Sequence, residues 1–134
     1  MRGFAETAHI FFAAVGGFLG WFLGGYDGFL YALVLFIVLD YITGVMLAIL
    51  MKELSSNIGF KGIFKKVLIF MVVAVGHTID VYVLGSGSAI RTAVIFFYLS
   101  NEGISIIENA SKIGLPIPEK LKQVLEQLNK EDTK

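Results

Sequence analysis

The chain has 134 residues, enough for one domain, and 56% of them are hydrophobic while 16% are charged. Soluble domains average about 45–50% apolar and about 25% charged residues, so this composition excludes a disordered tail and indicates a small integral membrane protein. Eleven basic residues balance eleven acidic ones, so no net charge attracts nucleic acid. The chain has no cysteine, which excludes disulfide bonds and thiolate sites.

Four segments approach the roughly 20 apolar residues that a membrane-spanning helix needs. We expect an all-α bundle in residues 1–112, with helices near 8–25, 28–51, 66–84 and 89–108. The first segment has the apolar length of a signal peptide. However, only Arg2 precedes it as a basic residue and no small-residue cleavage site follows, so we expect a retained helix.

The tail at 113–134 follows a different pattern. Pro116 and Pro118 end the fourth helix, and Pro118 also suits the first turn of a new one. An apolar stripe then predicts an amphipathic helix near 118–129, formed by Leu121, Val124, Leu125 and Leu128. Because so short a helix is marginal alone in water, we expect it to lie on the membrane or on another copy. A frayed, solvated tail is the alternative.

The loop between the second and third predicted helices carries most of the positive charge, which comes from Lys52, Lys61, Lys65 and Lys66. Loops rich in lysine stay in the cytoplasm. With four helices, both termini are then expected to be cytoplasmic.

Small residues recur at intervals of four in the first predicted helix, at Gly16, Gly20 and Gly24, and more weakly in the second, at Gly44 and Ala48. Such spacing lets helix backbones approach closely, and close packing drives helix association in lipid. These faces could pack within one chain or between copies, and the sequence leaves both open.

The predicted helices also contain ionisable groups, Asp40, His77, Asp80 and Glu102. Each charge near the centre of a spanning helix costs about 2.5–3.5 kcal/mol on insertion scales, so four of them suggest a function. At about 1.5 Å per residue they lie roughly 6 to 20 Å from the outer surface, as a ladder of separate levels. With Ser105 and Asn109 they could line a water-filled pore, or they could pair inside a closed bundle, for example Asp40 with His77.

No pattern in the chain indicates an enzyme or a cofactor. His77 and Asp80 are too few for a metal site, which needs three or four ligands. The chain contains neither a phosphate-binding loop nor a nucleophile elbow.

Several short motifs together resemble one family, the toxin-secretion and phage-lysis holins of Gram-positive bacteria and their phages. The resemblance covers about residues 30 to 128. The motifs are Leu39-Asp40-Tyr41-Ile42-Thr43-Gly44, Ser55-Ser56, Gly59-Phe60-Lys61-Gly62-Ile63, Lys65-Lys66, Asn101-Glu102-Gly103-Ile104-Ser105-Ile106-Ile107-Glu108-Asn109 and Gly114-Leu115-Pro116-Ile117-Pro118.

The resemblance implies a multi-pass protein of the bacterial cytoplasmic membrane that self-associates and opens lesions. A cell-wall-degrading endolysin, or a toxin without a signal peptide, would leave through them, and direct contact with that partner is not implied. Asp40, Lys61, Lys65, Glu102 and Asn109 match positions of the family pattern, to which no catalytic role is attached. Two other functions remain open, a narrow proton or ion pathway and a non-conducting membrane scaffold.

Overall fold

The computed structural model describes residues 2–133, with side chains described for residues 3–127. All regular structure in this part of the chain is helical. It comprises α1 (Arg2–Leu23), α2 (Gly28–Leu50), α3 (Ser56–Thr78), α4 (Ala89–Ile113) and α5 (Glu119–Thr133), with a π-helical turn at Ile79–Val83 that continues α3. The prediction of an all-α membrane bundle is confirmed.

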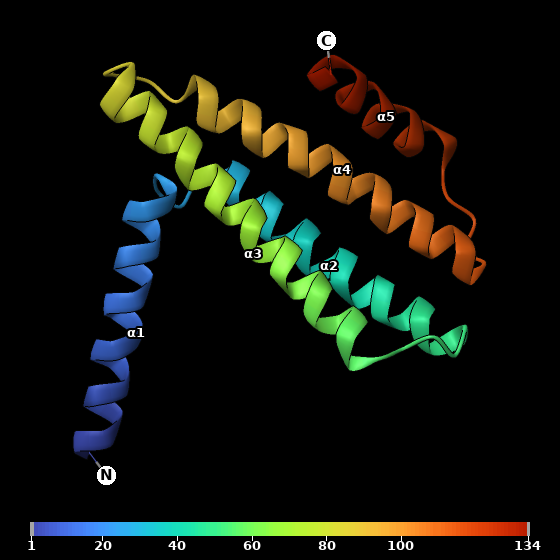
Figure 1. Ribbon diagram of the computed structural model, residues 1–134, viewed down its shortest axis with the longest axis horizontal. Coiled ribbons are helices and arrows are strands. Elements are labelled where there is room, and N and C mark those ends of the chain that lie inside the picture. Colours follow the sequence, from blue (N-terminus) through green and yellow to red (C-terminus); the bar gives the residue numbers. More distant parts are fainter. Residues whose placement is uncertain (1, 134) are drawn as a thin grey trace.

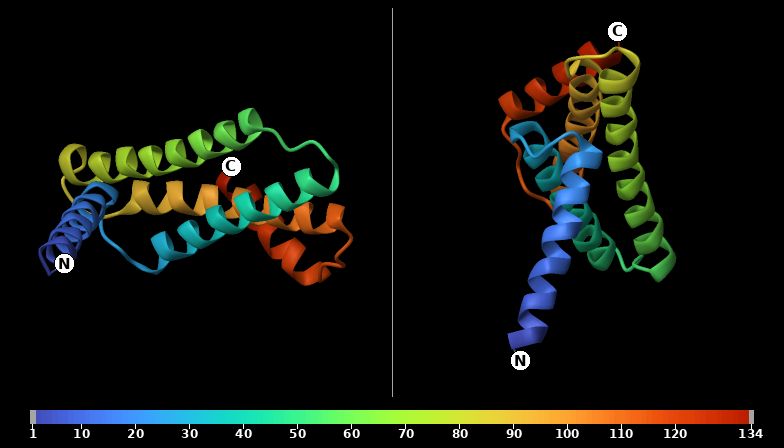
Figure 2. Two further views of the ribbon diagram at one scale, coloured as in Figure 1. Left: turned by 90° about the horizontal axis from the view of Figure 1, so that it is seen from below. Right: turned by 90° about the vertical axis from the view of Figure 1, so that its left-hand side faces the viewer.

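The middle three helices lie side by side (Figures 1 and 2). Helices α2 and α4 run in the same direction and pack closely on each other. Helix α3 runs in the opposite direction and connects the end of α2 to the beginning of α4. We call the two ends of this bundle the 24–27 end, which also holds loop 84–88, and the 51–55 end, which also holds loop 114–118. Helix α1 leaves the 24–27 end and points away from the other helices, contacting mainly α3 (Figure 2).

Three helices are long and apolar enough to cross a membrane, at Gly3–Leu23, Gly28–Leu50 and Ala89–Ile113. By length and apolarity, the described residues therefore hold three candidate spans and not the predicted four. The segment predicted near 66–84 is not a separate apolar helix, because α3 begins at Ser56 and its first half includes three lysines. Its regular α-helical part ends at Thr78, where the π-helical turn begins.

Capping residues explain where the helices of the bundle begin and end. Asp27 caps α2 and Ser55 caps α3, each by accepting a hydrogen bond from the backbone N–H three residues later. Gly114 ends α4 in the left-handed conformation, with φ of +114°, which glycine adopts without strain.

The 24–27 half of the bundle has a closely packed apolar interior. Six large apolar side chains at its centre are at most 8% exposed, and they are Leu30, Leu33, Ile37, Ile69, Val73 and Ile95. We call these six residues the apolar seal. Leu33, Val73 and Ile95 are fully buried at its centre, while Ile69 at its edge also lines an open cavity with Lys65 and Glu102.

Helix α5 folds back along α4 (Figure 1). Of its predicted apolar stripe, Leu125 is buried over Gly103 of α4, while Leu121 and Val124 remain about half exposed. The side chain of Leu128 lies outside the described residues. Helix α5 therefore packs on the protein's own α4 through Leu125, and the expected contact with lipid or another copy stays a prediction.

Candidate functional site

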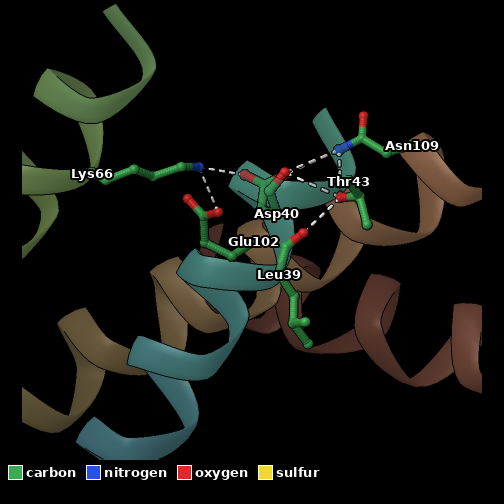
Figure 3. A network of polar contacts seen from close by, with 6 residues as sticks. All are labelled: Leu39, Asp40, Thr43, Lys66, Glu102 and Asn109. Atoms are coloured by element: carbon green, nitrogen blue, oxygen red, sulfur yellow. Dashed lines mark hydrogen bonds and ion pairs between the residues drawn. The ribbon is translucent and has the colours of Figure 1, made fainter. Parts of the chain in front are cut away.

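A network of polar side chains crosses the middle of the bundle (Figure 3). The ammonium group of Lys66 in α3 donates hydrogen bonds to Asp40 in α2 and to Glu102 in α4, and its Nζ lies 2.8 Å from Glu102 Oε2. The three side chains are 19%, 13% and 8% exposed, respectively. One cation thus joins two carboxylates from three different helices.

The same carboxylate of Asp40 also contacts α4 nearer the 51–55 end. The Asn109 amide donates to Asp40 Oδ1 at 3.2 Å and to Thr43 Oγ1 at 3.0 Å. Thr43 in turn donates to the backbone carbonyls of Leu39 and Asp40, and this hydrogen bonding holds it in place (Figure 3). Asp40 therefore connects the Lys66 contacts to Asn109.

The network satisfies the polar groups that it contains. Among the described side chains, no buried nitrogen or oxygen lacks a hydrogen-bond partner. A charge in lipid is costly unless it is paired, and the pairing of Lys66 explains how α3 carries a lysine at this depth. Asp40 pairs with Lys66 and not with His77, the pairing that the sequence suggested. Ser105 lies near the network, in the wall of a crevice that also contains Asn109.

A second polar cluster lies at the 24–27 end and centres on Arg91, which is 3% exposed. Its guanidinium donates to the carbonyl of Leu23 at 2.6 Å, to Asp27 Oδ2 at 2.7 Å and to the carbonyl of Gly25 at 2.8 Å. Arg91 therefore fastens the connection between α1 and α2 to the start of α4.

The contact with Arg91 also affects the acidity of Asp27, which lies in the loop between α1 and α2. Partial burial acts to raise the pKa of Asp27. The hydrogen bonds from Arg91 and from the Leu30 N–H, together with the positive charge of Arg91, outweigh burial and lower the pKa below its usual value. Asp27 therefore stays ionised well into the acid range.

Asp80 belongs to this second cluster. It is 1% exposed, and its two carboxylate oxygens accept the backbone N–H groups of Ile90 and Arg91, both at 2.9 Å. These N–H groups belong to the first turn of α4, where no side chain from α4 itself supplies a cap. Asp80 therefore caps α4 from the neighbouring π-helical turn.

The four predicted intramembrane groups thus form two clusters and not a ladder of separate levels. Asp40 and Glu102 meet at Lys66, Asp80 lies beside Arg91, and His77 lies near Gly24 and Arg91 at the same end. A Cβ atom built on Gly24 would lie 2.6 Å from His77 Nδ1 and 2.7 Å from Arg91 Nε. Gly24 also has φ of +90°, so both the lack of space for a side chain and the backbone conformation require glycine at this position.

The small residues of α1 and α2 have different surroundings. Gly24 is packed as just described, and Gly20 lies under the ring of Tyr26, whose hydroxyl donates to the carbonyl of Gly16 at 2.6 Å. A Cβ atom on Gly16 would meet nothing within 4 Å. On α2, Gly44 and Ala48 line the crevice that contains Asn109. Part of the glycine-rich face is therefore used within the chain.

The predicted cytoplasmic lysines also separate. Lys52 lies in the 51–55 loop with φ of +58°, while Lys61 and Lys65 are exposed on the first half of α3. Lys66 is partly buried in the network. Assigning Lys66 to the loop missed its role in the network. Ser55 caps the start of α3, and recognising it as a capping residue would have placed Lys66 inside a helix. Among the described residues, no three histidine or acidic side chains are grouped closely enough to hold a metal ion.

Residues 17–130 match the sequence model of the bacteriophage holin family. The chain belongs to this family. It is therefore a membrane-inserted member of a family of pore-forming proteins, which are not enzymes, and the resemblance drawn from the sequence motifs is confirmed.

Relatives from Gram-positive bacteria and a phage agree with this assignment. An uncharacterized 14.9 kDa protein of Clostridium perfringens is 47% identical over 87% of this chain and 88% of its own length. An uncharacterized protein of Listeria monocytogenes is also 47% identical, over 82% of this chain and 78% of its own length. A probable holin of Bacillus phage phi105 is 41% identical over 60% of this chain and 59% of its own. No solved structure matches the chain.

Proposed function

We propose that copies of this chain assemble in the bacterial cytoplasmic membrane and open lesions through which an endolysin or a signal-less toxin leaves the cell. The family match over residues 17–130 carries this proposal. The similarity to a probable phage holin supports it.

The single chain explains why opening would require assembly. Its ion pairs and hydrogen bonds face inward, and large apolar side chains such as Phe11, Phe18, Trp21 and Val38 are exposed on its outer surface. An isolated chain in lipid would therefore be closed. Lining a water-filled hole would require the inward polar groups of Asp40 and Glu102 to turn to water, and neighbouring copies would then cover the apolar surfaces.

The proposed orientation follows from charge. Lys52 lies in the 51–55 loop, and Lys61 and Lys112 lie near the same end of the bundle. Positively charged residues favour the cytoplasmic side. We therefore place the 51–55 end and the C-terminal helix α5 in the cytoplasm.

Inducible expression in a bacterium tests the proposal. The chain is expressed with an active cytosolic endolysin, with a catalytically inactive endolysin, and alone, while culture turbidity is recorded. Abrupt lysis after a delay, only with the active endolysin, is the expected result. If turbidity never falls although the chain is in the membrane, the proposal is wrong.

A narrow proton or ion pathway is the second candidate, and the observation that favours it is the junction of Asp40, Lys66 and Glu102. Paired ionisable groups inside membranes also serve as proton relays. The size of the solutes that pass separates the two functions. A relay would depolarise cells without releasing a cytosolic dye or enzyme, whereas a lesion would release both.

A further inference from the structure

The 51–55 half of the bundle contains a crevice that neither the family assignment nor the polar network explains. Two neighbouring cavities, of about 280 and 340 Å³, lie between α2, α3 and α4. They share four lining residues, Tyr41, Val45, Leu54 and Gly59. We treat them as one crevice and call it the 51–55 crevice.

Small side chains leave this space open. Gly44 and Ala48 lie on the α2 wall and Gly59 lies on the α3 wall. The ring of Tyr41 crosses toward α3, where its hydroxyl lies 3.5 Å from a Cβ atom built on Gly59. Helices α2 and α3 make few other contacts, because each packs mainly on α4.

The deep wall of the crevice is polar. Asp40, Ser105, Glu108 and Asn109 line it, and no lysine or arginine does. Glu108 is exposed, and Asp40 is the residue that joins the crevice to the Lys66 network. Contact with lipid chains raises the free energy of polar groups of this kind, so water fits the crevice better than lipid.

The apolar seal closes the path beyond Asp40. Ile37, one turn away on α2, is 5% exposed, and Val73 and Ile95 are fully buried. Asp40 lies twelve residues from the start of α2 and ten from its end. At about 1.5 Å per residue, the crevice therefore extends along about 15 Å of α2, and the remaining part of about 18 Å, which includes the apolar seal, still separates Asp40 from the 24–27 end.

We infer that the 51–55 crevice is a water-filled half-channel that opens on one side of the membrane only and ends at Asp40. The inference deepens the proposed function, on which it rests for the placement of the 51–55 end in the cytoplasm. It identifies the walls of the crevice as the surface from which a pore lining would develop, and the apolar seal as the part that must separate.

The lack of native cysteine allows a direct test. Single cysteines are introduced at Ser105 in the crevice wall, at Ile95 in the seal and at Val38. Val38 is the matched control, because it is 47% exposed on α2 but faces outward, where lipid would surround it. Asn57→Cys, which is exposed in the first turn of α3 and lies outside the crevice lining, gives the reaction rate of a solvent-exposed thiol.

Sealed membrane vesicles are treated with a charged, membrane-impermeant thiol reagent, with either the cytoplasmic or the outer face exposed. We expect Ser105→Cys to react from the cytoplasmic face at a rate near that of Asn57→Cys. We expect Ile95→Cys and Val38→Cys to react at least about 100-fold more slowly, because a charged reagent must lose its hydration to enter apolar surroundings. A cationic reagent should also modify Ser105→Cys faster than an anionic one, because the acidic residues Asp40 and Glu108 line the crevice.

Each other outcome overturns the inference. Reaction of Ser105→Cys as slow as that of Val38→Cys means that lipid or side chains fill the crevice. Reaction from both faces means that the seal does not exclude water, and reaction from the outer face alone means that the crevice opens on the opposite side. The measurement needs no endolysin, so failure of lysis and failure of this inference are recorded separately.

Discussion

Replacing Lys66 with methionine removes the one cation that bridges the carboxylates of Asp40 and Glu102. The methionine keeps an unbranched apolar side chain, so the loss of charge is the main change. Because the two carboxylates are only 13% and 8% exposed, water screens them poorly. Removing one partner of a buried ion pair costs about 3–5 kcal/mol, and we expect Lys66→Met to lower the free energy of unfolding by that amount.

The adjacent lysine provides the control. Lys65 is exposed, and ion pairs at exposed positions contribute only about 0–1 kcal/mol, so Lys65→Met should change stability by no more than that. A triple variant, Asp40→Asn with Lys66→Met and Glu102→Gln, carries no charge in the network. It should regain most of the lost stability, because fully neutral replacements of a buried ion pair are often tolerated.

The assay is unfolding of the purified protein in detergent micelles by increasing dodecyl sulfate, followed by helical circular dichroism. If Lys66→Met and Lys65→Met unfold at the same dodecyl sulfate fraction, the network does not stabilise the chain and the reasoning is refuted.

Three further predictions use the same unfolding assay. Arg91→Lys keeps the charge but cannot make all three guanidinium contacts. The free energy of unfolding should fall by about 1.5–3 kcal/mol for each hydrogen bond that is not replaced. Wild-type stability would show that Arg91 does not fasten the α1–α2 connection to α4. The pKa of Asp27 is lower in the folded state, so the stability that ionised Asp27 contributes is complete above the unfolded pKa of about 3.9 and is lost as pH falls through the folded pKa. Asp27→Asn should remove this part of the pH dependence of unfolding. An unchanged pH dependence in acid would contradict the prediction. Gly76→Ala should cost about 1–3 kcal/mol because its Cβ would lie 3.2 Å from the backbone of Arg91, whereas Gly62→Ala should cost nothing because it meets only the Tyr41 ring at 3.5 Å; equal effects would show that α3 and α4 do not depend on this close approach.

The length of the apolar segments was sufficient to predict a helical membrane protein, because lipid forces the backbone to satisfy its own hydrogen bonds. Apolar length did not predict where α3 begins. That helix starts on the cap of Ser55 and includes lysines that a hydropathy scale assigns to a loop. Its burial among α2 and α4 depends on Lys66 meeting carboxylates that are 26 and 36 residues away in the chain.

The candidate site was predictable in its residue types but not in its pairings. Asp40, Glu102 and Asn109 were singled out as polar groups in apolar helices, and they do meet in one network. Arg91 was not singled out, because nothing local shows that it reaches the carbonyls of Leu23 and Gly25 and the carboxylate of Asp27, which lie 64 to 68 residues earlier. Contacts of this kind depend on how the helices cross, which a pattern within one helix does not encode.

The cap that Asp80 provides for α4 has a consequence for biogenesis. The first N–H groups of α4 receive their acceptor from the π-helical turn before it, so the beginning of α4 is complete only when residues 79–91 have closed into their hairpin. In a bilayer, an unsatisfied N–H group costs several kcal/mol. We therefore expect α3 and α4 to enter the membrane together as a helical hairpin. A nascent chain that ends within loop 84–88 would then leave Asp80 without the two N–H groups that donate hydrogen bonds to it.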